Sequence, residues 1–479
     1  MKVCLVFPPP EKGMNGPWLN PYLPYGLFTL AAYLERQGHE LSVIDCMVEG
    51  LSHSRLKERI YYFKPEVLGV TLLSSVHDSG YKCLKIAKEI DGKILTVLGG
   101  AHASALDREL LQHWPEADVI VRKEGEISMA NLLSDPGGMA AIKGVTYRDG
   151  EKIIRNEDEK PVDNLDSLPF PALHLAKMEK YFRMADRYEF HLRSPSSSLM
   201  TSRGCIGKCT YCASPFLWPK LRINSPEYVI ENIKYQQRGY GIRDFKFFDD
   251  YFPVSMGWMR KFHKKVKDQQ IDISYRCMGR ADLVNDELLA MMKETGCYYI
   301  DFGIESGSQK ILDSVNKKVA IDQVKKAIQL AEKHKIRRGG FFMVGFKGET
   351  AEDLSATLKL ACSLPFDRAC FSQTRVYPGT RIYEDNKIGP SFWFDGEELK
   401  DVYNAPVYRP KEYSALDLEN IIRFFTFSAR KKHFWRNLSL FFKMRRKRPK
   451  FVIFMALLKQ LIGSVFSFDR VRLKDLAIR

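Results

Sequence analysis

The chain has 479 residues, which is too long for one ordinary domain and suits two or three. Hydrophobic residues make up 45% of it and charged residues 28%, as in soluble globular proteins, so stability should not require disulfides. The N-terminus reaches Pro8 before the apolar region of a signal peptide could form. We therefore expect a reducing, cytoplasmic location for the ten cysteines.

The net charge of +16 is concentrated in one segment of the chain. Residues 430–450 contain ten Lys or Arg side chains and no acid. A protein that binds nucleic acid over its whole surface would spread its cations more widely. Nucleic acid is therefore not among the partners that we expect.

Residues 1–125 alternate short apolar runs with amphipathic stretches near 24–37, 52–62, 76–90 and 104–113. Runs that are apolar on both faces and separated by helices predict a parallel sheet covered on each side, as in a doubly wound, Rossmann-like α/β domain. Such sheets bind ligands beyond the carboxyl ends of their strands. The expected strands are Val3–Phe7, Leu41–Asp45, Val67–Thr71, Ile94–Leu98 and Val119–Val121.

A hairpin and a linker are expected to follow this first domain, which we place at residues 1–130. The hairpin spans Gly144–Arg155 and turns at Asp149-Gly150. The polar, proline-containing stretch Asp163–Pro171 is typical of a linker, so we assign residues 131–195 to the hairpin and linker together.

A second alternating series occupies residues 196–400, with helical patterns near 225–239, 255–267, 285–294, 321–335 and 350–362. Six strand–helix units in succession predict a partial, TIM-like (β/α)6 barrel, whose chemistry takes place at the carboxyl ends of the strands. The expected strands are Ser198–Thr201, Phe245–Phe248, Ile273–Cys277, Tyr299–Gly303, Gly340–Val344 and Cys370–Thr374.

Residues 401–479 are predicted to form a helical, basic C-terminal region. The longest apolar stretch, Phe451–Phe466, is interrupted by Lys459 and Gln460 and is too short to span a membrane. Cations and aromatic residues alternate over 430–460, a composition that favours peripheral contact with an anionic membrane. Contact with nucleic acid and a helical cap over the barrel are the alternatives. A membrane-facing segment would suit a lipid or other apolar substrate.

Three cysteines follow the first barrel strand at C-x3-C-x2-C spacing: Cys205, Cys209 and Cys212. A structural zinc site needs four ligands, and no fourth Cys or His lies nearby in the sequence. A [4Fe–4S] cluster bound by three cysteines leaves one iron open to another ligand. We expect Arg203 and Lys208 to offset the negative charge of such a cluster. A zinc knuckle or three unrelated cysteines are the alternatives.

This loop, after the first strand of a six-unit barrel, resembles the radical S-adenosylmethionine (SAM) superfamily. The resemblance covers residues 196–385 and implies that SAM binds the open iron and is cleaved by one electron to methionine and a 5′-deoxyadenosyl radical. Further segments fit the same family: Phe248–Asp250, Gly279–Asp282, Gly303–Gly307, Gly345–Thr350 and Tyr377–Thr380.

The resemblance also implies which residues contact SAM. Arg280 and Glu305 are expected as polar partners, Asp249 as a partner of the amine or of the substrate, and Gly345 as a turn that lets SAM approach. Ordinary salt bridges at the ends of strands are the alternative for each charged residue. The full candidate set is Tyr211, Asp249, Arg280, Glu305, Ser306 and Gly345.

The N-terminal domain resembles the cobalamin (B12)-binding domain of many radical SAM enzymes, through Pro21–Leu27, Gly38–Asp45, Gly99–Ala103 and Val121–Glu126. It departs from other cobalamin domains at Pro8–Gly13, where an Asp-x-His-x-x-Gly loop would supply a histidine to cobalt. Cobalt would then lack a histidine of the protein as its lower ligand. A flavodoxin-like domain that binds no B12 is the alternative. The candidate cobalamin contacts are Thr71, Ser74, Ser75, Gly99, Gly100 and His102.

Together the two resemblances imply a cobalamin-dependent (class B) radical SAM methyltransferase that methylates an unactivated carbon of a small-molecule, lipid or other apolar substrate, with a flavodoxin or ferredoxin as electron donor. An unactivated carbon is no nucleophile, so a radical must be made first. Alternatives are a cyclase or oxidative rearrangement enzyme without methyl transfer, a methylthiotransferase, and a sensor without catalysis. A methylthiotransferase would need a second cysteine set, for which Cys4, Cys46 and Cys83 are too dispersed.

Overall fold

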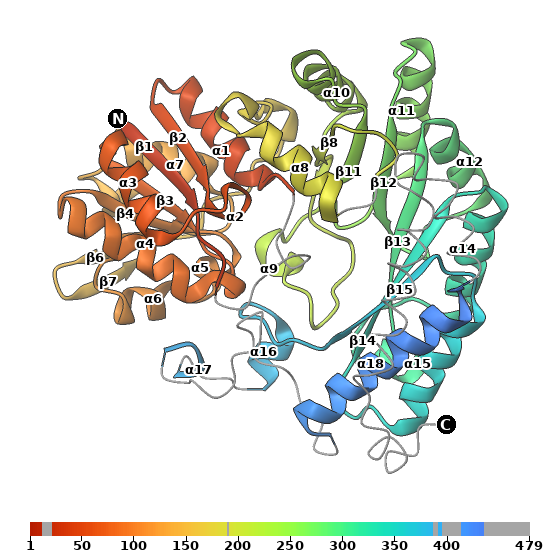
Figure 1. The fold of residues 1–479 in the computed structure, drawn as a ribbon. Coiled ribbons are helices and arrows are strands. Elements are labelled where there is room, and N and C mark those ends of the chain that lie inside the picture. The colour runs from red at the N-terminus through yellow and green to blue at the C-terminus, as the bar shows by residue number, and fades with distance from the viewer. Residues whose placement is uncertain (12–21, 189–190, 387–390, 395–412, 435–479) are drawn as a thin grey trace. The chain divides into compact units, whose positions relative to one another are not determined.

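The computed structural model describes residues 1–11, 22–188, 191–386, 391–394 and 413–434 (Figure 1). The chain divides into two compact units. The first unit comprises Met1–Ile206, Tyr211–Ile242 and Val376–Pro406, and the second comprises Gly207–Thr210, Arg243–Arg375 and Val407–Arg479. The domain boundaries expected near residues 130, 195 and 400 stay predictions.

The first unit is built on a seven-stranded sheet in the order β2-β1-β3-β4-β5-β6-β7. The first five strands are parallel neighbours, as predicted, and all of them are buried. The expected hairpin forms β6 and β7, and it also extends the sheet, because β6 pairs antiparallel with β5. The strands are β1 (Lys2–Phe7), β2 (Glu40–Asp45), β3 (Val67–Thr71), β4 (Leu95–Gly99), β5 (Val119–Val121), β6 (Val145–Asp149) and β7 (Lys152–Arg155).

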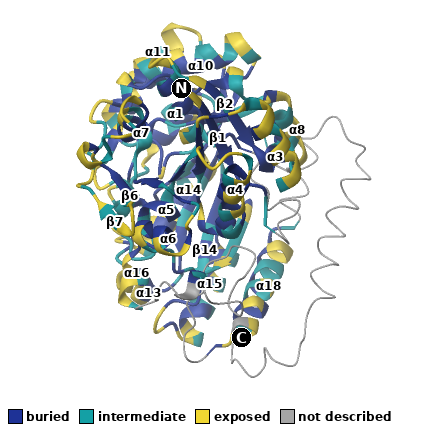
Figure 2. Ribbon diagram, turned by 90° about the vertical axis from the view of Figure 1, so that its left-hand side faces the viewer, coloured by how far each residue is buried: buried dark blue, intermediate teal, exposed yellow. Residues whose placement is uncertain are grey.

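Amphipathic helices cover this sheet. Helix α4, for example, buries Cys83, Leu84 and Ala87 at helical spacing, and Figure 2 shows the buried strands behind helices whose outer faces are exposed. The helices of the sheet domain are α1 (Tyr25–Arg36), α2 (Cys46–Glu49), α3 (His53–Phe63), α4 (His77–Ile90), α5 (Ala101–Ala105), α6 (Asp107–His113) and α7 (Gly125–Ser134).

The rest of the first unit follows the linker. The short strands β9 (Ser202–Arg203) and β10 (Arg222–Ile223) pair antiparallel on either side of the cysteine loop. The remaining elements of this unit are α8 (Met178–Tyr188), β8 (Ser196–Leu199), α9 (Ser214–Leu217), α10 (Pro226–Tyr240), α16 (Arg381–Asp385) and α17 (Ser391–Phe394).

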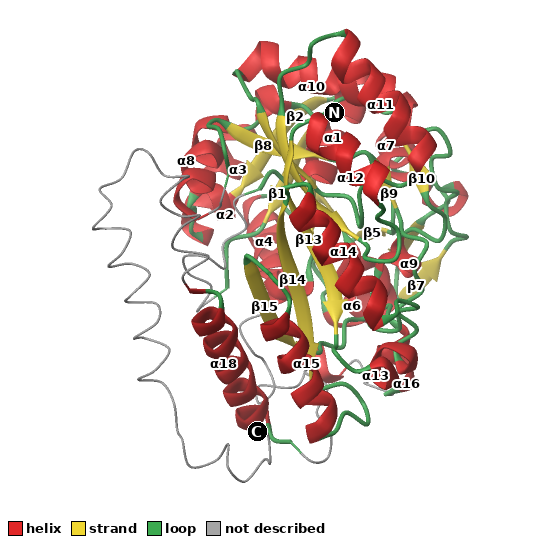
Figure 3. Cartoon of the chain, turned by 90° about the vertical axis from the view of Figure 1, so that its right-hand side faces the viewer, coloured by secondary structure: helices red, strands yellow, loops and turns green. Residues whose placement is uncertain are grey.

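The second unit contains five parallel strands that are neighbours in chain order, from β11 to β15. With β8 and α10, all six strands and all five helices predicted for the barrel are formed. Figure 3 shows the helices outside the strands. The elements are β11 (Asp244–Phe247), α11 (Met256–Asp268), β12 (Ser274–Gly279), α12 (Asp286–Glu294), β13 (Cys297–Glu305), α13 (Gln309–Ser314), α14 (Ile321–Lys333), β14 (Arg337–Val344), α15 (Ala351–Ser363) and β15 (Arg368–Gln373).

A final helix, α18 (Ala415–Lys432), packs on β15 and α15. Its Leu418, Ile421 and Phe425 are buried in a cluster with Leu354 of α15. Arg430–Lys432 form its last turn, and the remainder of the basic segment expected to contact a membrane lies outside the described residues from 435 onward. Within the described part of the chain, no helix has the length and apolar character needed to cross a bilayer.

Candidate active site

A cavity of about 480 Å³ lies at the carboxyl ends of the parallel strands in the first unit. Its volume is within the range of small-molecule sites. The predicted contacts Thr71, Gly99 and Gly100 line it, together with residues that come from beyond the linker, among them Arg203 and Trp218. The edge of the sheet that the sequence predicted to face a ligand is therefore the edge that carries the cavity.

Two glycines without side chains, Gly99 and Gly100, leave space for a ligand in this cavity. Gly100 has a φ of 93°, and a Cβ atom there would lie 2.9 Å from the carbonyl oxygen of Leu72. The backbone at position 100 therefore requires glycine. At Gly99 an added Cβ would make only ordinary contact, 3.7 Å from the carbonyl oxygen of Val121. A floor of bare backbone suits a large, flat ligand such as a corrin ring.

The other three predicted cobalamin contacts, Ser74, Ser75 and His102, do not line the cavity. His102 is buried, and its Nδ1 and Nε2 lie 2.9 Å from Ser74 Oγ and 2.9 Å from His77 Nδ1. Burial and the neighbouring His77 hold the pKa of His102 well below its ordinary value. His102 thus belongs to a buried hydrogen-bonded chain, and its role toward cobalamin stays a prediction.

One wall of the cavity is a buried ion network that our reading of the sequence missed. Arg203 lies 3.1 Å from Glu124 and 2.6 Å from Glu126, while Arg222 donates to Glu124 at 3.0 Å. Burial raises the pKa of Glu124, but the two arginines outweigh this effect and hold it below its usual value. Arg203 pairs with two carboxylates of the domain built on the seven-stranded sheet, and its expected role in offsetting the charge of a cluster stays a prediction.

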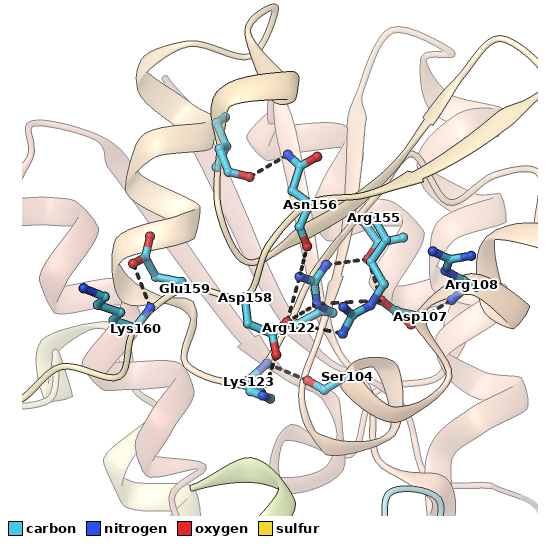
Figure 4. Close-up of polar contacts among 12 residues, drawn as sticks. Ser104, Asp107, Arg108, Arg122, Lys123, Arg155, Asn156, Asp158, Glu159 and Lys160 are labelled. Atoms are coloured by element: carbon cyan, nitrogen blue, oxygen red, sulfur yellow. Dashed lines mark hydrogen bonds and ion pairs between the residues drawn. The ribbon is translucent and has the colours of Figure 1, made fainter. Parts of the chain in front are cut away.

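The stretch that supplies these carboxylates is itself fixed by a polar network (Figure 4). Arg122 is buried and donates to Thr146 at 2.6 Å and to Asp158 at 3.0 Å. Lys123, whose φ is 57°, donates to the same Asp158 at 2.7 Å. Because Asp158 binds both Arg122 and Lys123, the backbone that leads into Glu124 is held in one direction.

The cysteine loop begins two residues after Arg203. Cys205, Cys209 and Cys212 are all half-buried and form no disulfide, and Tyr211 lies among them in the sequence, also half-buried. The backbone N–H of Ser214 donates to Cys212 Sγ at 3.4 Å. Among the residues that the structure describes, no three His, Cys, Asp or Glu side chains are arranged as ligands of a single metal ion.

The donor set of this loop fits an iron–sulfur cluster. In a cluster each thiolate binds its own iron, so the sulfurs need not converge on one ion. Gly204 has a φ of 97°, and a Cβ there would lie 2.9 Å from the carbonyl oxygen of Lys220, so the loop starts with a turn that only glycine allows. Its middle is tied down within the second unit, where Thr210 donates to the carbonyl of Val315 at 3.0 Å.

The polar residues predicted to contact SAM end successive strands of the second unit. Asp249 follows β11 and is buried. Arg280 follows β12 and pairs with Asp282 through two bonds of 3.1 and 2.9 Å. Glu305 ends β13 with a φ of 70°, beside a register shift in the sheet, and accepts from Lys317 at 2.8 Å. Strained residues and bulges of this kind are concentrated at functional sites.

Ser306 and Gly345 are held by contacts within the barrel. The Ser306 hydroxyl lies 3.1 Å from that of Thr357 on α15, which suits a structural role. Gly345 has a φ of 86°, and its N–H donates to Glu349 at 2.6 Å; Phe346 donates to the same carboxyl oxygen at 3.2 Å. The predicted contacts of these residues with SAM stay predictions.

The buried Glu349 makes stability depend on pH. Burial raises its pKa to about 7 from 4.5. The folded state therefore binds this proton more tightly than the unfolded chain, so the stability that the neutral carboxyl contributes is full below pH 4.5 and is lost as pH rises through about 7. Relative to Glu349→Gln, we expect the wild type to lose up to about 3 kcal/mol across this range, measured by urea unfolding. A pH-independent difference between the two proteins would contradict this.

The chain belongs to the radical SAM superfamily, in the branch with an N-terminal B12-binding domain. The family model for the B12 binding domain matches residues 15–133, and that for the radical SAM superfamily matches residues 199–361. An uncharacterised methyltransferase of Pyrococcus horikoshii is 32% identical over 434 residues, which cover 88% of this chain and 91% of that protein. An anaerobic magnesium-protoporphyrin IX monomethyl ester cyclase of Rubrivivax gelatinosus is 28% identical over 86% of this chain and 74% of its own.

Solved structures agree with this fold. The cobalamin-dependent SAM radical enzyme OxsB, with aqua-cobalamin and SAM bound, matches 97% of this chain and 72% of its own with a TM-score of 0.73 at 16% identity. The radical SAM methyltransferase TsrM of Kitasatospora setae, with cobalamin and a [4Fe–4S] cluster bound, matches 86% of this chain and 80% of its own with a TM-score of 0.67 at 16% identity. The predicted order of a cobalamin-binding domain and a radical SAM barrel is confirmed.

Proposed function

We propose that this protein is a cobalamin-dependent radical SAM methyltransferase that acts on an unactivated carbon of a small molecule. The observation that carries the proposal is the match over 88% of the chain to a protein described as a methyltransferase. The geometry supports it, because one chain combines a glycine-floored cavity at the edge of the B12-binding sheet with a three-cysteine loop.

Different residues of the chain would bind the different cofactors. Cys205, Cys209 and Cys212 would hold the cluster, and the cavity with Gly99 and Gly100 would hold the corrin ring. When bound, the cluster supplies the electron that cleaves SAM, and cobalamin supplies the methyl group. At the strand ends of the second unit, the charged side chains already described would orient SAM, and the buried surroundings would keep water from reactive species.

The nucleosides formed from SAM test this proposal. The anaerobically reconstituted protein, given reductant, cobalamin and SAM, should form both S-adenosylhomocysteine and 5′-deoxyadenosine, with S-adenosylhomocysteine dependent on added cobalamin. A cyclase, the alternative favoured by the Rubrivivax relative, would form 5′-deoxyadenosine without S-adenosylhomocysteine. The latter result would overturn the methyltransferase proposal.

We propose further that a flavodoxin or ferredoxin donates the electrons and that the protein is cytoplasmic.

We also propose that residues 430–460 contact the inner face of the membrane and that the substrate is a lipid or other apolar molecule. The membrane contact is supported by the ten cations of residues 430–450, each of which adds about 1 kcal/mol of binding free energy near an anionic surface. Co-sedimentation with vesicles containing anionic lipid should exceed that with neutral vesicles and disappear when the cations of 443–450 are replaced with Gln. Equal binding to both vesicle types would contradict membrane contact.

A further inference from the structure

A short antiparallel ribbon joins the two ends of the cysteine loop. Strand β9 ends at Arg203, two residues before Cys205, and β10 begins at Arg222; the two arginines are register partners in this ribbon. The pairing continues through a bond of 2.8 Å from the N–H of Asn224 to the carbonyl of Thr201. The path of the chain into and out of the loop therefore depends on how the ribbon is held.

The two arginines of the ribbon share one buried carboxylate. Glu124, at the N-cap of α7, accepts from Arg222 through both carboxyl oxygens, one of them at 3.0 Å, and lies 3.1 Å from Arg203. The backbone N–H of Val162 donates to the same carboxyl group at 3.2 Å. The side chains of Arg222, Glu124 and Arg203 are only 3%, 9% and 13% exposed, so salt in the solvent screens these ion pairs little.

The same carboxylate belongs to the wall of the cavity. Glu124, Glu126 and Arg203 line the cavity, whereas Arg222 lies outside its lining. Arg203 also lies 2.6 Å from Glu126, so buried ion pairs join the cavity wall to the ribbon. A shift of the ribbon would therefore displace side chains of the cavity wall together with the backbone that leads to Cys205.

Opening this ribbon would be costly. It would separate Glu124 from two guanidinium groups and leave a charge buried without its partners. The bonds that would be lost are charge-assisted, and such bonds are stronger than those between neutral groups. The ion pairs therefore keep the ribbon closed before a ligand binds, and a ligand that requires the closed ribbon does not have to order it.

We propose that Glu124 and Arg222 are positioning residues that pre-organise the cobalamin cavity and the ends of the cysteine loop together. This inference rests on the proposed function, which assigns cobalamin to the cavity and the cluster to the loop. While the ion pair holds the ribbon closed, the two cofactors should bind independently. When the pair is weakened, binding of one cofactor should order the ribbon and so strengthen binding of the other.

Cobalamin titrations of the full chain, before and after reconstitution of the cluster, test this role. The Kd of the wild type should agree between the two forms to within about twofold. Arg222→Lys keeps the charge but cannot donate two parallel bonds, so its Kd without the cluster should rise by about fivefold or more and return toward the wild-type value with the cluster. Glu124→Gln should show the same pattern with a rise of about tenfold or more.

The matched control is Glu157→Gln, which removes an ion pair of 2.9 Å between the exposed side chains of Glu157 and Lys143. This variant should bind cobalamin like the wild type in both forms. Arg222→Lys decides the outcome, because Arg222 does not line the cavity and acts on it through Glu124. An unchanged Kd in Arg222→Lys, a rise that the cluster leaves unaltered, or an equally large cluster dependence in the wild type would each overturn the proposal.

Formation of S-adenosylhomocysteine and 5′-deoxyadenosine by the wild type is measured separately. If both products form while Arg222→Lys shows no cluster dependence of cobalamin binding, the positioning role fails and the proposed function stands. If the wild type does not bind cobalamin in either form, both are overturned.

Discussion

Replacing Arg203 with methionine should lower the free energy of unfolding by about 3–5 kcal/mol. Arg203 is the partner of Glu126 at 2.6 Å and shares Glu124 with Arg222, and the carboxylates are 5% and 9% exposed. Loss of the guanidinium would leave Glu126 charged and buried, which costs far more than the loss of a surface ion pair. Urea unfolding of the full chain, followed by circular dichroism, measures the effect.

Two further variants show whether this loss comes from the buried charge. Lys220→Met removes a pair 3.5 Å long whose side chains are 72% and 86% exposed, and its effect should stay within about 0.5 kcal/mol. Adding Glu126→Gln to Arg203→Met should recover part of the lost stability, since it removes the unpaired charge. A loss below about 1 kcal/mol in Arg203→Met would show that the network contributes little.

Gly99→Leu should weaken cobalamin binding by on the order of a hundredfold, or about 3 kcal/mol. Gly99 lines the cavity, and its position accepts a Cβ without a clash, so the variant should fold and place its side chain where the corrin ring would lie. Titration of the protein with cobalamin, followed by its absorption spectrum, gives the Kd.

The matched control for this variant is Gly92→Leu, just before the same strand. An added Cβ at Gly92 meets no atom within 4 Å, and Gly92 is not part of the cavity lining. This variant should bind cobalamin like the wild type. If Gly99→Leu also binds normally, the cobalamin site is elsewhere.

The fold could be predicted because its signals are local. Short apolar runs separated by amphipathic stretches predicted the parallel strands, and the structure places β1, β3 and β5 within one residue of the expected bounds. The order of the strands in the sheet comes from the structure. The joining of the β6–β7 hairpin to the sheet was not predictable in this way. It depends on which edge is left open by β5, and no residue in the hairpin itself specifies that edge.

The site was predictable only where one short segment carries it. The cysteines are recognisable by their spacing, whereas Glu126 and Arg203 are 77 residues apart, and neither shows its partner in the sequence. His102 shows what a local motif leaves unspecified. A histidine after two glycines at a strand end was predicted to contact cobalamin, and this stays a prediction; the buried hydrogen-bonded chain that it forms with Ser74 and His77 has no local signal in the sequence.

The most direct test of the account is the cluster itself. After anaerobic reconstitution, the wild type should contain about four iron and four sulfide per chain, and SAM should change the EPR spectrum of the reduced cluster by binding the open iron. Cys205→Ala, Cys209→Ala and Cys212→Ala should each lose the cluster. Retention of the cluster in any of these variants, or an EPR spectrum that SAM leaves unchanged, would contradict the account.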